Sequence, residues 1–245
     1  MCGRFAFYSP HEAVVQLFGL PADTPEIEPQ YNIAPTSWIP VVRQSPDVAA
    51  TRQLAMMYWG LVPSWAKDRS IGARMINARA ETLQEKPAFR HAFRLRRGLV
   101  PADGYFEWMK AGGRDKQPYL IRPASGAPFA LAAIWETWRD PATGEPLVSC
   151  SLVTTDASRS VAHIHDRMPV IIPGSAFAQW LDPHNRDVEG LARLFAPDAA
   201  GALVATPVSR SVSNARNQGP ECIEPMTMET PGLPFDAPAD DSVDT

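Results

Sequence analysis

The sequence predicts an α+β fold: a single domain built on a curved, mostly antiparallel sheet with short peripheral helices. Between residues 38 and 155 lies a series of apolar, β-branched and aromatic segments that are typical of strands. Polar connections, AGGRDKQ at 111–117 and RDPATGE at 139–145, are typical of hairpin loops. The strands do not alternate with long helices, which argues against a doubly wound parallel sheet, and no internal repeat is visible.

The individual elements are expected in the following order. A helix is expected over HEAVVQLFGL, because Ser9 suits the N-cap, Pro10 suits the first helical position and Gly19 lies near the end. An irregular Pro-rich stretch follows at 21–37. Residues 38–44 and 51–60 form paired strands, and 78–96 is helical with an interruption at Pro87. Further strands are expected at 98–110, 118–123, 128–138, 147–155 and 203–209, with short helices at about 156–163, 174–181 and 187–195.

The chain divides into one large unit and a tail. With 245 residues it is long enough to bury a full core. Residues 1–225 are expected to form the domain. Residues 226–245 are acidic and rich in proline, which predicts a disordered tail.

Composition excludes several classes of protein. Apolar residues make up 45% and charged residues 20%, as in soluble globular domains, and no apolar run approaches the roughly 20 residues that span a bilayer. The first residues lack a signal peptide, so a cytoplasmic location is expected, with no membrane partner. Three cysteines without CxxC spacing and five poorly spaced histidines indicate neither a disulfide framework nor a metal site.

Charge is distributed unevenly. The net charge of −4 becomes +3 when residues 221–245 are set aside, because that segment carries seven acids and no Lys or Arg. Residues 60–110 contain ten Lys or Arg against five Asp or Glu. A basic region of this kind is compatible with binding to phosphate, and equally with a solvated charged face.

Cys2 is the first candidate for chemistry. If Met1 is removed, Cys2 carries a free α-amine beside its thiol, with pKa values near ~7.7–8 and ~8.5. This 1,2-aminothiol can capture an aldehyde as an imine and then close a thiazolidine ring, or it can act as the N-terminal nucleophile of an amide hydrolase. Alternatively, a cysteine at position 2 is incidental.

Two further candidates are groups that can transfer protons. His165, in IHDRMPVII (164–172), is suited to general acid–base catalysis, or is a surface histidine beside a charge pair. Glu107, in DGYFEWMK (103–110), shares one strand face with Tyr105 and Met109. Apolar neighbours would raise the pKa of Glu107, unless the strand is at an edge and Glu107 faces solvent.

The remaining candidates come from two short segments. In MINARAET (75–82), Asn77 can orient a nucleophile and Arg79 suits a phosphate, but Asn77 is equally natural as a helix N-cap. In WGLVPSW (59–65), Trp59 and Trp65 flank a turn and are either core residues or platforms for unpaired bases.

Together these segments resemble a known family. Eight segments occur in the order found in the SRAP (SOS response-associated peptidase) family and span about residues 1–225. They are MCGRF, YNIAPT (31–36), WGLVPSW, INARAET, GYFEW, AAIWETW, IHDRMPVII and PVSRSVSNARN. The one departure is AAIWE in place of the more usual AGLWE. The resemblance implies a compact α+β domain around a curved antiparallel sheet.

The resemblance also implies an activity. Family members bind abasic sites in single-stranded DNA and join them covalently to the N-terminal cysteine as a thiazolidine. Carried over by motif, Cys2 is the nucleophile, Asn77 holds its amine and thiol, Glu107 shuttles protons, and His165 protonates the sugar ring oxygen. The DNA contacts that the resemblance implies are Arg4, Trp65, Arg79, Arg167 and, more weakly, Thr154.

Three functions follow as hypotheses. The first is an abasic-site crosslinking enzyme, with lyase activity through the imine and removal of Met1 by itself or by an aminopeptidase. It needs no cofactor and no metal, and it would act as a monomer on single-stranded DNA, associated with the nucleoid when bound. The second is a thiol peptidase acting on other proteins through Cys2. The third is a non-catalytic single-strand binding module, which needs the aromatic and basic residues but not Cys2, Glu107 and His165.

Overall fold

The computed structural model describes residues 2–45, 51–110, 116–197 and 201–226. Its strands are β1 (Phe5–Phe7), β2 (Gln30–Ile33), β3 (Trp38–Gln44), β4 (Arg52–Trp59), β5 (Asn77–Arg79), β6 (Arg97–Ala102), β7 (Gly104–Lys110), β8 (Lys116–Pro123), β9 (Phe129–Arg139), β10 (Pro146–Asp156), β11 (Arg167–Pro169), β12 (Ile171–Ile172) and β13 (Leu203–Pro207). The α-helices are α1 (His11–Phe18), α2 (Arg90–Leu95), α3 (Phe177–Leu181) and α4 (Val188–Ala192). Short 3-10 helices are η1 (Arg69–Arg74), η2 (Ala80–Thr82), η3 (Gly174–Ala176), η4 (Arg193–Phe195), η6 (Arg210–Ser213) and η7 (Pro220–Cys222).

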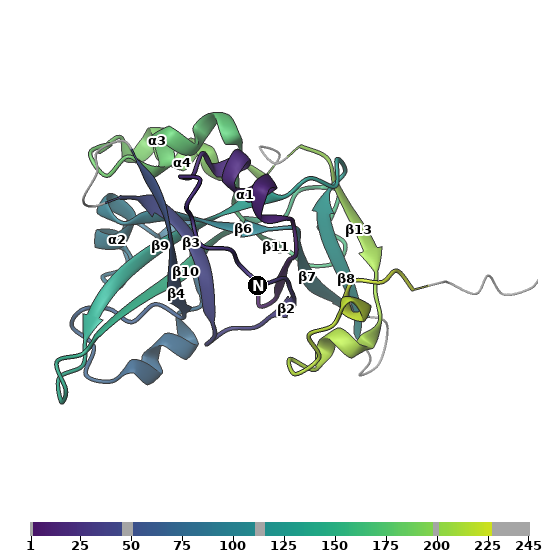
Figure 1. Cartoon of the computed structure of the whole chain (residues 1–245), viewed down its shortest axis with the longest axis horizontal. Helices are drawn as coiled ribbons and strands as arrows, with labels where there is room; N and C mark the ends of the chain where they lie inside the picture. Colours follow the sequence, from purple (N-terminus) through teal and green to yellow (C-terminus); the bar gives the residue numbers. More distant parts are fainter. Residues whose placement is uncertain (1, 46–50, 111–115, 198–200, 227–245) are drawn as a thin grey trace, which may run out of the picture.

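The strands form two sheets rather than one. The larger has the order β11-β10-β4-β3-β6-β9-β12, with β5 also paired to β10. Since β10 pairs with β9 as well as with β4, five of these strands form a closed ring. The smaller sheet has the order β13-β8-β7-β1-β2, and Figure 1 shows it beside the larger one, with the short helices at the periphery. The α+β class with a curved, mostly antiparallel sheet is confirmed.

Two apolar clusters explain where the site lies. Phe5 and Tyr105, on β1 and β7 of the smaller sheet, belong to the main core, where Phe5 packs edge-on against Trp59 of β4 at 5.4 Å between ring centroids. Ala6 and Phe106 point to the opposite face and pack under the C-terminal segment around η6 and η7. The purple N-terminal segment therefore lies in the middle of the molecule, between the two sheets (Figure 1).

Several local expectations are wrong. The helix expected at 78–96 is reduced to η2 and α2, because Asn77–Arg79 pairs with β10 as β5 and Pro87 interrupts the rest. Residues 156–163 form no helix: Asp156 is the last residue of β10, and turns follow from residue 159. Helix α1 ends at Gly19 with φ 59°, as expected, but the backbone N–H and hydroxyl of Ser9 bond to Asp103 instead of capping the helix.

The expected tail lies outside the described residues, apart from Met226. In the described part of the chain, no helix is long and apolar enough to cross a membrane. Within the same ranges, no group of three or more His, Cys, Asp or Glu is placed to hold a metal ion.

Candidate active site

Cys2 is held between the two sheets by the strands on either side of it. The Phe106 backbone N–H of β7 donates to the Arg4 carbonyl oxygen at 2.9 Å, which keeps the segment before β1 alongside β7. The side-chain amide of Asn77 donates to the Cys2 carbonyl oxygen at 2.7 Å. Cys2 itself is fully buried. A residue at the very start of the chain is thus fixed in place by contacts from β5 and β7.

Asn77 reaches Cys2 because it lies on a strand. β5 runs parallel to β10, with Asn77 opposite Leu152. The amide nitrogen of Asn77 is used by the Cys2 carbonyl, whereas its Oδ1 is buried without a hydrogen-bond partner among the residues that the structure describes. Buried polar atoms are normally paired, so this oxygen is available to accept from a donor beside Cys2.

Glu107 follows the strand alternation expected from the sequence. Tyr105 and Met109 pack with the main core, and Phe106 and Trp108 with the second cluster. Glu107 is only 4% exposed, and burial raises its pKa from 4.5 to about 7. A carboxyl group with a pKa near 7 is present in both protonation states at neutral pH, as proton transfer requires.

The Cys2 thiol responds to the same environment. Burial raises its pKa, and the negative charge of Glu107 raises it further. The pKa of Tyr105 is also raised, by burial first and then by Cys2 and Glu107. Tyr105 and Glu107 share the face of β7 that packs with the main core, to which Cys2 also belongs. The Tyr105 hydroxyl is buried and has no hydrogen-bond partner in the described part of the chain.

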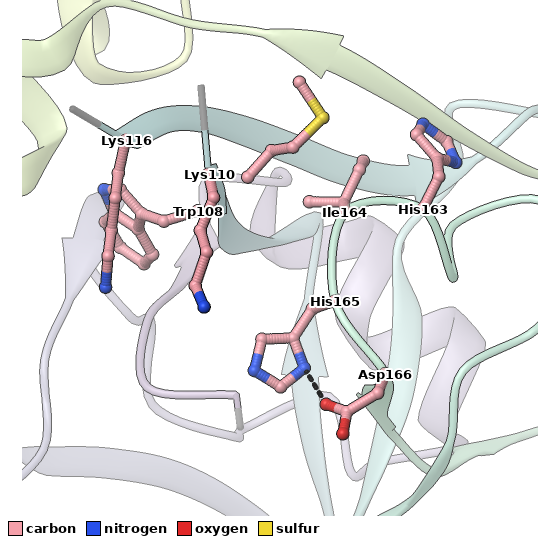
Figure 2. Close-up of a pocket in the computed structure, with 8 residues that line it drawn as sticks. Trp108, Lys110, Lys116, His163, Ile164, His165 and Asp166 are labelled. Atoms are coloured by element: carbon pink, nitrogen blue, oxygen red, sulfur yellow. Dashed lines mark ion pairs between the residues drawn. The ribbon is translucent and has the colours of Figure 1, made fainter. Parts of the chain in front are cut away.

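His165 lies on the loop between β10 and β11. It lines a pocket of about 430 Å³ together with Trp108 and Lys110. Its Nδ1 lies 2.8 Å from Asp166 Oδ1, and Figure 2 marks this ion pair with a dashed line. The Arg167 backbone N–H donates to the same Nδ1 at 2.9 Å, which assigns the proton of the neutral ring to Nε2. When the ring is protonated, Nδ1–H can donate to Asp166. Burial lowers the pKa of His165.

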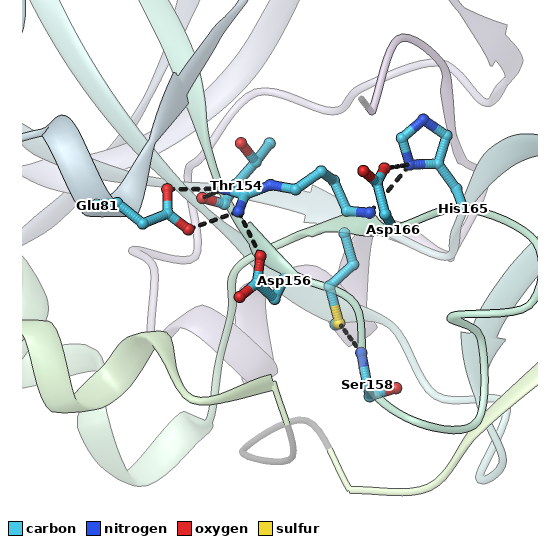
Figure 3. Close-up of polar contacts among 8 residues, drawn as sticks. Glu81, Thr154, Asp156, Ser158, His165 and Asp166 are labelled. Carbon is cyan, nitrogen blue, oxygen red and sulfur yellow. Dashed lines mark hydrogen bonds and ion pairs between the residues drawn. The ribbon is translucent and has the colours of Figure 1, made fainter.

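Arg167 is occupied by protein acceptors, of which Figure 3 labels Glu81, Thr154 and Asp156. Its guanidinium donates to Glu81 at 2.5 and 3.0 Å, to Asp156 at 2.7 Å and to the Thr154 carbonyl at 2.8 Å. Its positive charge is therefore matched within the protein by two carboxylates. The Thr154 hydroxyl is fully buried and has no partner among the described residues.

The other expected DNA contacts differ in their surroundings. Arg4 is partly buried and donates to Asn32 Oδ1 at 2.7 Å and to the Val212 carbonyl at 2.8 Å, which ties β1 to the C-terminal segment. Arg79 is exposed on β5. Trp65 is 60% exposed, which favours a contact surface over a core position.

Comparison with known proteins decides the family. Residues 1–215 match the family model described as SOS response associated peptidase (SRAP). The chain belongs to the SRAP family. It is 39% identical over 226 residues to the abasic site processing protein YoqW of Bacillus subtilis, covering 91% of this chain and 99% of the relative. It is 34% identical over 232 residues to the abasic site processing protein HMCES of Gallus gallus, covering 83% of this chain and 68% of the relative.

The SRAP fold also appears in a solved structure. A protein from Bacteroides thetaiotaomicron superimposes with a TM-score of 0.81 at 26% identity, covering 92% of this chain and all of that one. The overall fold is thus one that has been seen by crystallography.

The SRAP motifs expected to act together are brought together only in part. Asn77 contacts Cys2 directly, and Glu107 changes the pKa of Cys2. The charge of Asp166, beside His165, in turn raises the pKa of Glu107. Tyr105 and Asp166 were not singled out from the sequence. Their signals were present, because Tyr105 is two residues before Glu107 on the same strand face and Asp166 follows His165.

Proposed function

We propose that this protein processes abasic sites in single-stranded DNA by joining the abasic-site aldehyde to Cys2 as a thiazolidine. The observation that carries the proposal is Cys2 fixed by Asn77 next to Glu107, whose pKa is about 7. The names of its SRAP relatives, abasic site processing proteins, support the substrate.

The pKa values favour an order of steps. After removal of Met1, the Cys2 amine adds to the C1′ aldehyde, and loss of one water gives an imine. The thiol then adds to the imine carbon: its S–H proton passes to the nitrogen, and the five-membered ring closes. Because burial keeps the thiol protonated, the amine is the better first nucleophile. Glu107 accepts and returns the protons in both steps.

The other residues have supporting roles in this proposal. Asn77 holds the Cys2 carbonyl through its amide nitrogen and accepts from the new α-amine through Oδ1. His165 protonates the ring oxygen of the closed sugar through Nε2, with Asp166 stabilising the imidazolium. Arg79 and Trp65 contact the strand at phosphate and base, and Arg4 and Arg167 hold the surrounding chain segments in place through their hydrogen bonds.

A thiol peptidase acting on other proteins is supported less well. Such an enzyme needs an activated thiolate, and both burial and Glu107 raise the pKa of the Cys2 thiol instead. Imine chemistry on the amine has no such requirement.

Mass spectrometry of the intact protein tests the proposal. Mixed with single-stranded DNA that carries one abasic site, the protein should start at Cys2 and gain the mass of the oligonucleotide minus one water. Cys2→Ala should give no heat-stable adduct yet retain affinity for the DNA, since phosphate and base contacts do not involve the thiol. A heat-stable adduct with Cys2→Ala, or an active preparation that retains Met1, would rule the mechanism out.

A further inference from the structure

Lys110 and Lys116 face each other at the ends of β7 and β8. They are direct partners in the antiparallel register, and both side chains are exposed. Like charges directly opposite one another on a strand pair destabilise a sheet. Neither lysine forms an ion pair with a residue in the ranges that the structure describes. This arrangement does not serve the fold, and it is suited to an anion.

The two lysines line the same pocket as His165. Figure 2 shows their side chains running side by side on one wall, next to the Trp108 indole, with His165 and Asp166 on the other side. Among the described residues that line the pocket, Asp166 is the one carboxylate, and its Oδ1 is already 2.8 Å from His165 Nδ1. A pocket with two ammonium groups and a single engaged carboxylate favours a negatively charged ligand.

The Trp108 wall of the pocket is held in place. The Trp108 indole N–H donates to Ser213 Oγ at 3.0 Å, and the Arg4 guanidinium lies 5.8 Å from the ring centroid. Trp108 follows Glu107 on β7 but packs with the second cluster, on the opposite strand face, so it is His165, which also lines the pocket, that links this subsite to the proposed chemistry. Because His165 is proposed to act on the abasic sugar, a DNA strand bound there would bring a neighbouring phosphate to the pocket that the two lysines line.

We propose that Lys110 and Lys116 together bind the backbone phosphate of one nucleotide flanking the abasic site, with Trp108 forming the wall of that subsite. This inference rests on the proposed function, because it takes single-stranded DNA as the ligand. The pair raises affinity and sets the direction of the strand, and it takes no part in bond formation.

A double variant tests the assignment. K110Q/K116Q should raise the half-saturating DNA concentration for crosslinking roughly fivefold to twentyfold at moderate salt. It should also lower the slope of log affinity against log salt by about 0.7 per lost phosphate contact. The maximal crosslinking rate should stay within about twofold, and K110R/K116R should retain native affinity. The matched control is Lys86→Gln, an exposed lysine of the same basic stretch.

Truncated substrates locate the phosphate. With the abasic site at the 5′ end of the oligonucleotide in one substrate and at the 3′ end in another, the lysine effect should persist in only one. The proposal would be overturned if the double variant lost equal affinity for both truncated substrates, or if it bound DNA no more weakly than Lys86→Gln. Non-covalent binding in a Cys2→Ala background separates this outcome from a failure of the crosslinking chemistry, because it measures the lysine contribution without bond formation.

Discussion

The side-chain amide of Asn77 donates a hydrogen bond of 2.7 Å to the backbone carbonyl oxygen of Cys2. This contact joins the first residues of the chain to β5, 75 residues later. It orients the backbone of Cys2, and with it any amine at that position, without touching the sulfur. The proposed nucleophile is therefore held through its main chain, and its sulfur makes one long contact, 3.9 Å, to the Arg4 carbonyl oxygen.

Replacing that donor should slow the reaction. Asn77→Asp keeps the size of the side chain but places a carboxylate oxygen against the Cys2 carbonyl, so we expect single-turnover crosslinking to fall by about tenfold or more, the equivalent of losing one hydrogen bond of about 1.5 kcal/mol. Asn77→Ala should have a smaller effect because it removes the donor without adding repulsion. If Asn77→Asp reacts as fast as the native chain, the amide does not orient the nucleophile.

Glu107 should make stability depend on pH. Its folded pKa of about 7 lies above the ordinary value of 4.5, so the native state loses stability as pH rises between these two values. Glu107→Gln removes this titration, and by pH 8 it should gain up to about 3 kcal/mol relative to the native chain, with no gain at pH 4. Urea unfolding at several pH values measures the difference.

Glu81 provides a control, because the pH dependence of its effect on stability has the opposite sign. Hydrogen bonding to Arg167 lowers the pKa of Glu81, so its stabilising effect is present at neutral pH and disappears as pH falls through the lowered value. Glu81→Gln should thus be less stable than the native chain at pH 7 and approach it in acid. Two variants with the same pH trend would show that Glu107 is not a buried, protonated group.

Variants of His165 and Glu107 should differ in which abasic substrate they react with slowly. If His165 opens the sugar, His165→Ala should slow crosslinking of a closed-ring abasic site more than that of an oligonucleotide with a preformed aldehyde. Glu107→Gln should slow both, by an amount within the ~10²–10⁴-fold range of general acid–base catalysis, and should also slow reversal of the thiazolidine. Equal slowing of both substrates by His165→Ala would assign His165 to binding.

Arg79 and Arg167 should behave differently although both belong to motifs of the family. Arg79 is exposed, so Arg79→Ala should weaken DNA binding and lower its salt slope by about 0.7. Arg167→Ala leaves Glu81 and Asp156 facing each other, so it should lower the free energy of unfolding by about 1–3 kcal/mol. Salt titrations and urea unfolding distinguish the two; a loss of stability with Arg79→Ala alone would reverse the assignment.

Tyr105 should limit stability. Its hydroxyl is buried with no partner among the described residues, and an unsatisfied hydroxyl costs about 1–3 kcal/mol. Tyr105→Phe should therefore raise the free energy of unfolding by about 1 kcal/mol, measured by urea denaturation. Phe106→Leu, on the opposite strand face, is the comparison and should be destabilising. A loss of stability with Tyr105→Phe would mean that the hydroxyl has a partner in solution.

Local pattern determined the strands and the environment of Glu107. WIPVVRQ became β3 (Trp38–Gln44) as expected, and the alternation from Tyr105 to Met109 placed Glu107 on the core face, where its pKa rises. Both follow from the two-residue period of a strand, which neighbours along the chain are sufficient to set. The ordered motifs also identified the family, because each one is a short run of residues.

Long-range pairing decided the rest. Asn77 is equally suited to cap a helix or to sit in a strand, and it is the parallel partner strand β10 that makes it a strand residue facing Cys2. Nothing in the sequence near Arg167 indicates that folding brings it against Glu81, 86 residues earlier. Such contacts join segments with no local signal for each other, and their free energy comes from burial and pairing that exist only once both sheets have formed.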